Sequence, residues 1–492
     1  MSSAFVDLAP PEAIARYEPV IGLEVHVQLA TVTKIFCGCP TSFGAQPNSN
    51  VCPICLGLPG ALPVLNRAAV ELAIKAALAL NCQVRPVSRF ARKNYFYPDL
   101  PKGYQISQYE EPLAGPGWVE IPVNGSLKRI GVTRVHMEDD AGKSIHDGFR
   151  DSDRYTYVDL NRSGTPLIEI VGEPDLRSSQ EAYDYLTELK QTLQFVDVST
   201  CDMEKGHLRC DANVSVRLKG AARLGTKAEV KNLNSFRFLK LALDHEIGRQ
   251  VAILESGGTI LQETRLFNSE TGETASMRSK EQAHDYRYFP EPDLAPLRVS
   301  DAWLDEIRAR MPELPAARRA RFMESYGLRE YDAEVLTASR AIAEYYEKAA
   351  TRSGQPKTAA NWVMGDLMGA LKAAGKEIDE SPVGPEQLGE LVALIHKGEI
   401  SGKLAKEIFP KMFASGEAAP AIIASEGLRQ ISDAGALEKI VDEVLANNAK
   451  QVEQFKSGKT TVLGFLVGQA MKASRGQANP GVVSDLLKRK LC

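Results

Sequence analysis

The sequence contains no apolar run close to the roughly 20 residues that a membrane-spanning helix needs. Its first stretch, MSSAFVDLAPPEAIARYEP, has neither the basic region nor the continuous apolar region of a secretory signal. The chain also lacks a large net charge: the formal value is -4 over 492 residues. A uniformly basic nucleic-acid-binding surface is therefore excluded, but a local basic patch is not. We expect a cytoplasmic protein without a membrane role.

The sequence also lacks a complete Walker A phosphate-binding loop. Two segments, AGKS (141–144) and SGKT (457–460), resemble the end of such a loop. The position that should hold the first glycine carries Met137 in one case and Glu453 in the other. Any ATP would therefore be bound in another way.

The composition that remains is that of an ordinary globular protein, with 44% hydrophobic and 25% charged residues. The chain is long enough for about three domains. From residue 17 to 298, short alternating segments broken by Gly, Pro and Asn predict half-buried strands. After FPEPDLAPL (289–297) the periodicity becomes helical, which indicates a domain boundary.

Two helices are predicted among these strands. The first covers 180–195, where Ser178 provides a cap and an apolar face is formed by Tyr183, Leu186, Leu189 and Leu193. The second begins at 234 or 235 and ends at the glycines 257 and 258.

Four of the eight cysteines lie close together, in the pattern Cys37-x-Cys39-x12-Cys52-x2-Cys55. In a reducing compartment, clustered thiols indicate a metal site before they indicate disulfides. Four thiolates complete a closed tetrahedral shell, so we predict a structural Zn²⁺. Four free thiols, or two labile disulfides after oxidation, are the alternative.

Three predicted strands carry polar side chains on one face. In GLEVHVQL (22–29) the alternation places Glu24 and His26 together, and RCDANVSVRL (209–218) does the same for Asp211 and its polar neighbours. In TKAEVKNLN (226–234) the shared face holds Lys227, Glu229 and Lys231. If these faces converge, they offer oxygen ligands for Mg²⁺ and lysines for a triphosphate, which suits phosphoryl transfer. Separate, solvated strand faces are the alternative.

Two further segments combine charged residues with tyrosine or histidine side chains. The segment at 91–110 combines Lys93 with tyrosines, so it can stack on a base while neutralising phosphate; packing of the loop itself is the alternative. In RVHMEDDAGKS (134–144), three consecutive carboxylates that include Asp139 follow His136 closely, and such a set is unfavourable without a cation. A solvated acidic turn would explain it equally well.

The C-terminal stretch is dense in basic residues and has few acids after Glu453. Such a patch can contact the backbone of a tRNA through its phosphates, or it can be the solvated face of a helical bundle. The candidate tRNA-binding residues are Lys456, Lys459, Lys472 and Arg475.

The order and length of these segments closely resemble the family of B subunits of the glutamyl-tRNA(Gln)/aspartyl-tRNA(Asn) amidotransferase. The resembling stretches are VIGLEVHVQL, FGAQPNSN, LPGALPVLN, RKNYFYPDLPKGYQISQ, HMEDDAGKS, DLNRSGTPLIEIV, LRCDANVSVR, GTKAEVKNLNSF and HDYRYFPEPDL, and in the tail GFLVGQAMKASRGQANP.

The resemblance implies an α+β fold with a mixed-sheet cradle domain that carries a kinase-like site. It is followed by an all-α helical domain and a small helical tail that holds the tRNA. With the boundaries read from the sequence, these domains are residues 1–298, with the zinc-ribbon-like insert at 37–55, then 299–414 and 415–492.

The resemblance also implies the activity, a carbon-nitrogen ligase with glutamine as amido donor. ATP phosphorylates the side-chain carboxylate of mischarged Glu-tRNA(Gln) or Asp-tRNA(Asn), and ammonia then displaces the phosphate. The ammonia would come from a partner amidase (glutaminase), the A subunit, which a small C subunit would hold together with this chain in a heterotrimer.

Carried over by position, the resemblance assigns site roles to several residues. Glu24, His26 and Asp139 match metal-site positions for Mg²⁺, and Lys93 matches a lysine near the phosphates. Asp211 and Glu229 are further candidate metal ligands, and Lys227 and Lys231 are candidate contacts to the nucleotide.

Two other classes of protein compete with this interpretation. A stand-alone carboxylate-amine ligase acting on a small molecule would explain the carboxylates but not the basic tail. A non-catalytic tRNA-binding scaffold would explain the tail but not the Glu24 and His26 face.

Overall fold

The computed structural model describes residues 8–277, 286–427, 434–474, 478 and 480–491. The chain divides into two compact units, Met1–Leu314 and Pro315–Cys492. The first unit is built on a sheet and the second is helical, which confirms the predicted α+β class. Within the described ranges, no helix is long and apolar enough to cross a membrane.

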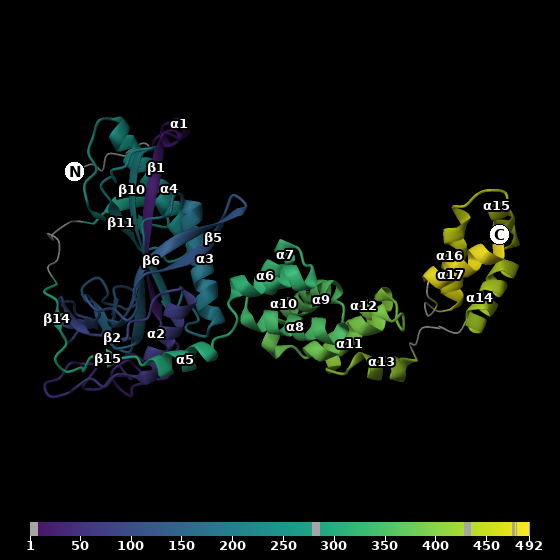
Figure 1. Ribbon diagram of the computed structural model, residues 1–492, viewed down its shortest axis with the longest axis horizontal. Helices are drawn as coiled ribbons and strands as arrows, with labels where there is room; N and C mark the ends of the chain where they lie inside the picture. Colours follow the sequence, from purple (N-terminus) through teal and green to yellow (C-terminus); the bar gives the residue numbers. More distant parts are fainter. Residues whose placement is uncertain (1–7, 278–285, 428–433, 475–477, 479, 492) are drawn as a thin grey trace. The chain divides into compact units, whose positions relative to one another are not determined.

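The first unit is organised around an eight-stranded mixed sheet with the order β13-β12-β11-β10-β1-β9-β6-β5. Figure 1 labels β1, β5, β6, β10 and β11 of this sheet. All neighbouring strands are antiparallel except β11 and β12, which are parallel. The strands are β1 (Tyr17–Gln28), β5 (Gly117–Val123), β6 (Ser126–Asp139), β9 (Pro166–Gly172), β10 (Leu208–Leu218), β11 (Ala228–Lys231), β12 (Thr264–Asn268) and β13 (Glu273–Ser276).

Strict alternation along β1 gives the sheet one apolar and one polar face. Leu23, Val25 and Val27 are buried in the core of the unit. Because successive side chains of a strand point to opposite faces, Glu24 and His26 must then lie on the other face. The core that β1 joins also contains residues of helices α2 (Arg67–Ala79), α3 (Ser179–Phe195) and α4 (Phe236–Glu255).

The two long helices begin at serine caps. The hydroxyl of Ser178 accepts a hydrogen bond from the Glu181 amide at 3.1 Å, and Ser235 caps α4 in the same way. Both predicted helices are thus confirmed, with boundaries within about two residues. The predicted apolar face of α3 was wrong at one position: Tyr183 is 36% exposed, and Tyr185 is buried in its place.

Smaller elements complete the first unit. Helix α5 (Asp301–Ala309) packs on α2, where the Trp303 indole donates to Glu71 Oε1 at 3.1 Å and Arg67 lies over the Trp303 ring. The short sheets are β14-β3-β4, β15-β2 and β7-β8. Their bounds, with that of the first helix, are α1 (Pro11–Ile14), β2 (Val87–Ser88), β3 (Ala91–Asn94), β4 (Tyr104–Ser107), β7 (Lys143–Ile145), β8 (Tyr157–Asp159), β14 (Phe289–Pro290) and β15 (Leu297–Arg298).

The second unit consists of helices, and those nearest the C-terminus share a core that includes Leu437, Val441, Leu466 and Leu487. The helices are α6 (Pro315–Tyr326), α7 (Glu330–Leu336), α8 (Arg340–Ser353), α9 (Pro356–Trp362), η1 (Val363–Leu367), α10 (Met368–Ala374), η2 (Ile378–Glu380), α11 (Pro385–His396), α12 (Gly402–Ser415), α13 (Ala419–Glu426), α14 (Ala434–Asn447), α15 (Ala449–Lys456), α16 (Val462–Ala473) and α17 (Pro480–Leu491).

Candidate functional site

The register of four strands sets polar side chains in a row across the sheet. His26 of β1 lies opposite Arg209 of β10 on one side and opposite Glu169 of β9 on the other. Glu169 in turn lies opposite His136 of β6. Directly opposed residues on one face of a sheet have their Cβ atoms about 5 Å apart, so these side chains contact one another.

A second row runs alongside the first. Glu24 lies opposite Asp211, and the Lys231 ammonium of β11 is 2.8 Å from Asp211 Oδ2 and 2.9 Å from Glu229 Oε1. Asn213 donates a hydrogen bond to Glu24 Oε1 at 3.0 Å. The polar faces of the three strands predicted from the sequence therefore converge on one surface.

Five acidic residues of this surface form what we call the carboxylate cluster: Glu24, Glu138, Glu169, Asp211 and Glu229. Two of them bracket an imidazole, because His26 Nε2 lies 3.5 Å from Glu138 Oε1 and 3.4 Å from Glu169 Oε2. The ligand atoms of these three residues lie within 4.8 Å of one another, so the three could hold a metal ion. Carboxylate oxygens are the donors that Mg²⁺ prefers.

The protonation behaviour of the cluster reflects its crowding. Burial raises the pKa of Glu24, and the negative charges of Glu169, Glu229 and Asp211 raise it further. Burial also acts to raise the pKa of Glu169, but hydrogen bonds from His136 and His26 bring that pKa well below its usual range. The Glu24 carboxylate is thus repelled by the negative charges around it, and a bound cation would relieve this repulsion.

Lys93 approaches the cluster from β3. Its ammonium lies 4.8 Å from the centre of the Tyr286 ring and 5.9 Å from that of Tyr95. Burial acts to lower the Lys93 pKa, but the charge of Glu138 and smaller contributions outweigh it, so the pKa is raised. Lys93 therefore stays a cation beside the carboxylates. Of the two other predicted nucleotide contacts, Lys231 pairs with Asp211 and Glu229, and Lys227 is exposed.

Asp139 has different partners from its sequence neighbour Glu138, which belongs to the carboxylate cluster. Alternation along β6 turns the two side chains to opposite faces. Asp139 is 1% exposed, forms an ion pair with Lys102 and accepts a hydrogen bond from the Ile106 amide at 2.7 Å. Its oxygens are thus already engaged by a buried ammonium and a backbone N–H.

Two members of the cluster were not singled out as ligands from the sequence. Glu138 is one of three consecutive acids, so its sequence position alone does not distinguish it from Asp139. The alternation of the strand does, because Glu138 points to the same face as His136 and Asp139 does not. Glu169 is the single charged residue of PLIEIVG (166–172). A carboxylate in an otherwise apolar strand is costly unless it is paired, so its isolation was the signal that could have found it.

A cavity of about 790 Å³ adjoins the cluster. Asp211 belongs to its lining, together with Arg209, Arg162 and Lys143. Arg209 also donates to Asp140 at 2.9 Å, which fixes its guanidinium at the edge of the cluster. The cavity therefore offers positive charge for an anionic ligand next to carboxylates for a cation.

The four clustered cysteines come together as a second candidate metal centre. The sulfurs of Cys37, Cys39, Cys52 and Cys55 lie within 4.8 Å of one another, and those of Cys37 and Cys52 are 3.6 and 3.7 Å from that of Cys55. A tetrahedral zinc site with Zn–S bonds of about 2.3 Å has sulfurs about 3.8 Å apart. The donor set and its spacing thus fit Zn²⁺.

Of the predicted tRNA-binding residues, Lys456, Lys459 and Lys472 are exposed. Lys456 ends α15 and Lys472 lies in the last turn of α16. The fourth, Arg475, lies outside the residues that the structure describes.

The fold and the site together define an α+β protein whose sheet carries a candidate cation and phosphate site. Residues 19–305 match the family model described as the GatB/GatE catalytic domain, and residues 344–491 match that described as the GatB domain. The aspartyl/glutamyl-tRNA(Asn/Gln) amidotransferase B subunit of Carboxydothermus hydrogenoformans is 58% identical over 96% of this chain and 99% of its own. The protein of the same name from Geobacter sulfurreducens is 57% identical with the same coverage. This chain belongs to that family of amidotransferase B subunits.

Proposed function

We propose that this chain catalyses the ATP-dependent step of tRNA-dependent amidation. It activates the side-chain carboxylate of Glu-tRNA(Gln), Asp-tRNA(Asn) or both, and ammonia then converts the activated group to the amide. The observation that carries the proposal is the carboxylate cluster, which lies beside Lys93 and Lys231 and next to a cavity with Arg209 in its lining. Membership of the B-subunit family supports the assignment.

The chemistry explains why such a site is needed. A carboxylate does not react with ammonia, because oxide would have to leave. Transfer of the γ-phosphoryl group of ATP to a carboxylate oxygen releases ADP and gives an acyl phosphate. Ammonia then attacks the acyl carbon, phosphate leaves with the C–O bonding pair, and the nitrogen gives up a proton.

The lysines and the carboxylates of the site have different roles in this reaction. Lys93 and Lys231 are placed to offset phosphate charge during transfer, and Lys227 can add to this from the solvent side. His26, Glu138 and Glu169 would hold Mg²⁺, and Glu24, Asp211 and Glu229, on the same face of the sheet, are further candidate ligands. When bound, Mg²⁺ supplies positive charge that stabilises the transferring phosphoryl group. For Asp139, whose oxygens contact Lys102 and Ile106, we propose a supporting role behind the cluster.

We further propose that the four cysteines hold a structural Zn²⁺. Four thiolates leave no open position for substrate, so this site would stabilise the insert and not take part in the reaction. The surrounding contacts support that role. Asn50, in the loop between the cysteine pairs, donates a hydrogen bond through its backbone N–H to the side-chain oxygen of Asn161 at 2.8 Å.

We propose that the tail from residue 415 binds the tRNA through Lys456, Lys459, Lys472 and Arg475, and that residues 1–298 and 299–414 are the catalytic and the linking domain. Ammonia would come from an amidase, the A subunit, and a small C subunit would complete a cytoplasmic heterotrimer. The family name, which specifies a B subunit, supports an assembly with other chains.

The decisive experiment is an amidation assay of the chain with and without its amidase partner, on glutamyl- and aspartyl-tRNA. Glutamine-dependent product formation should require both chains, whereas added ammonia should replace the amidase. Turnover of free glutamate with ammonia by the isolated chain would instead indicate a small-molecule ligase. ATP hydrolysis that is unchanged in Glu24→Ala would indicate a non-catalytic scaffold.

A further inference from the structure

Glu229 is the member of the carboxylate cluster whose orientation is fixed from a neighbouring strand. Its Oε2 accepts a hydrogen bond from the Thr264 hydroxyl at 2.8 Å, while its Oε1 is 2.9 Å from the Lys231 ammonium. Thr264 lies directly opposite Glu229 in the parallel pairing of β11 and β12. The Glu229 amide also donates to the Glu263 carbonyl at 3.0 Å. Both the backbone and the side chain of Glu229 are therefore held by the start of β12.

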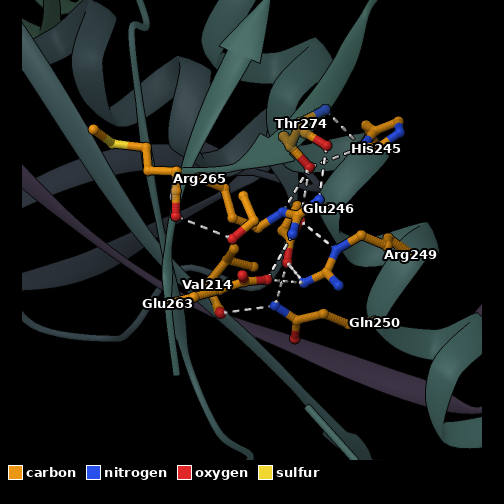
Figure 2. Close-up of polar contacts among 10 residues, drawn as sticks. Val214, His245, Glu246, Arg249, Gln250, Glu263, Arg265 and Thr274 are labelled. Atoms are coloured by element: carbon orange, nitrogen blue, oxygen red, sulfur yellow. Dashed lines mark hydrogen bonds and ion pairs between the residues drawn. The ribbon is translucent and has the colours of Figure 1, made fainter. Parts of the chain in front are cut away.

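The start of β12 is itself held by a buried ionic network (Figure 2). The guanidinium of Arg265, the residue after Thr264, lies 3.1 Å from Glu246 Oε2 and 2.6 Å from Glu263 Oε1, and it donates to the Thr274 carbonyl at 2.7 Å. These contacts join β12 to helix α4 and to β13. The strand that carries Thr264 is thus held by both α4 and β13.

Glu246 of α4 is the centre of this network. It has no exposed surface, and its two carboxylate oxygens accept hydrogen bonds from Arg249 at 2.6 and 2.9 Å. Figure 2 shows Glu246 between Arg249, Gln250 and Thr274. Gln250 donates to the same carboxylate at 2.9 Å and to the Val214 carbonyl of β10 at 3.1 Å. Glu246 and Glu263 balance the charges of Arg249 and Arg265. Because an unpaired buried charge is strongly unfavourable, these four side chains favour the one arrangement in which every charge is paired.

We propose that Thr264 is a positioning residue of the phosphoryl-transfer site. Its hydroxyl holds the Glu229 carboxylate toward Asp211 and Glu24, and the Glu246–Arg265 pair keeps the β12 backbone at the distance that this hydrogen bond requires. The proposal rests on the proposed function, in which Glu229 faces the bound cation. Without the hydroxyl, the carboxylate has Lys231 as its remaining anchor and can rotate about it.

The test is a pair of substitutions at Thr264 in the assembled enzyme. Thr264→Val removes the hydroxyl and keeps the shape, whereas Thr264→Ser keeps the hydroxyl. Loss of a hydrogen bond to a group that positions a metal costs roughly tenfold or more in metal affinity. We expect Thr264→Val to raise the Mg²⁺ concentration for half-maximal amidation by about that factor and to lower kcat, and Thr264→Ser to restore both. The KM for aminoacyl-tRNA and the glutaminase rate of the partner should not change.

A matched control comes from Thr133, whose hydroxyl donates to Glu173 Oε1 at 2.7 Å outside the carboxylate cluster. Thr133→Val removes a similar hydrogen bond and should leave the Mg²⁺ requirement as it is. A Thr264→Val enzyme with the wild-type Mg²⁺ requirement and kcat would overturn the inference. So would an equal shift in the Thr133→Val enzyme, since the effect would then not be local.

Glu229→Gln separates this inference from the proposed function. If Glu229→Gln abolishes amidation while Thr264→Val has no effect, the cluster is the site but Thr264 does not position it. If Glu229→Gln leaves amidation unchanged, Glu229 is not part of the site, and both the inference and this part of the proposed function fail.

Discussion

The ammonium of Lys34 lies 3.4 Å from the sulfur of Cys55, and both side chains are buried. The ammonium also contacts two neutral oxygens, the Asn50 carbonyl at 2.8 Å and the Leu160 carbonyl at 3.5 Å. A buried ammonium is strongly disfavoured without a negative charge close by. A tetrathiolate bound to Zn²⁺ carries excess negative charge and would supply it. Lys34 would thus complement the cysteine site electrostatically once zinc is bound.

We predict that Lys34→Met weakens zinc retention, because the excess negative charge of the tetrathiolate would lose its buried partner. Zinc release to a competing chelator, followed by a metal-sensitive dye, should be faster than in the wild-type protein. Lys190, half-buried in α3 and outside the cysteine cluster, offers a control of the same chemistry as Lys190→Met. Equal release rates for all three proteins would show that Lys34 has no part in holding the metal.

The double substitution Cys52→Ser and Cys55→Ser should remove the bound zinc entirely. We expect a lower unfolding temperature and little change in kcat for the protein that remains folded, because a closed four-thiolate site contributes to folding and not to the reaction. Metal analysis by mass spectrometry and thermal unfolding measure the two effects. Wild-type protein purified in reduced form without chelator, yet free of zinc, would contradict the prediction.

Glu24→Ala and His26→Ala should each abolish ATP-dependent amidation while the partner amidase keeps its glutaminase activity. Both residues belong to the polar face of β1, and we place the glutaminase chemistry on another chain. Measuring amide formation and glutamate release in the same reaction separates the two activities. Parallel loss of both would point to misfolding or to a broken interface between the chains.

Glu138→Gln and Asp139→Asn should change different properties of the protein, because the alternation of β6 places the two carboxylates on opposite faces. We expect Glu138→Gln to raise the Mg²⁺ requirement with little change in stability. Asp139→Asn leaves the Lys102 ammonium, 8% exposed, without its carboxylate. Removing one partner of a buried pair costs roughly 3–5 kcal/mol, so the unfolding temperature should fall.

The double variant Asp139→Asn with Lys102→Met should recover part of that stability, since no unpaired charge remains. Thermal unfolding of the single and double variants forms a cycle that isolates the pair. If Asp139→Asn changed the Mg²⁺ requirement and left stability as it was, Asp139 would be a metal ligand as the family resemblance implied.

Much of this site could be predicted from the sequence because alternation in a strand is a strong signal. The pattern of GLEVHVQL placed Glu24 and His26 on one face, and the structure has them there. Neighbouring strands could not be predicted, because register depends on pairing between distant segments. That pairing sets Glu169 beside His26, and it also brings Thr264 to Glu229. Long-range neighbours of this kind leave no local pattern.

The basic tail should act on tRNA binding and not on the reaction. Deleting the chain from residue 415, or changing Lys456, Lys459 and Lys472 together to Gln, should raise the KM for aminoacyl-tRNA and leave kcat at saturating tRNA nearly unchanged. All three lysines are exposed. Phosphate contacts release counterions, so each lost contact should lower the slope of log affinity against log salt by roughly one.

Lys490 is the matched control, because its ammonium is 2.7 Å from Asp442 Oδ1 and its charge is already offset. Lys490→Gln should change the salt slope less than any one of the other three substitutions. The comparison requires KM and kcat for each protein across a range of salt concentrations. If the tail deletion lowered kcat at saturating tRNA while KM and the salt slope stayed as they were, the tail would support the catalytic unit and would not bind tRNA. The exposed lysines would then be the ordinary solvated face of a helical bundle.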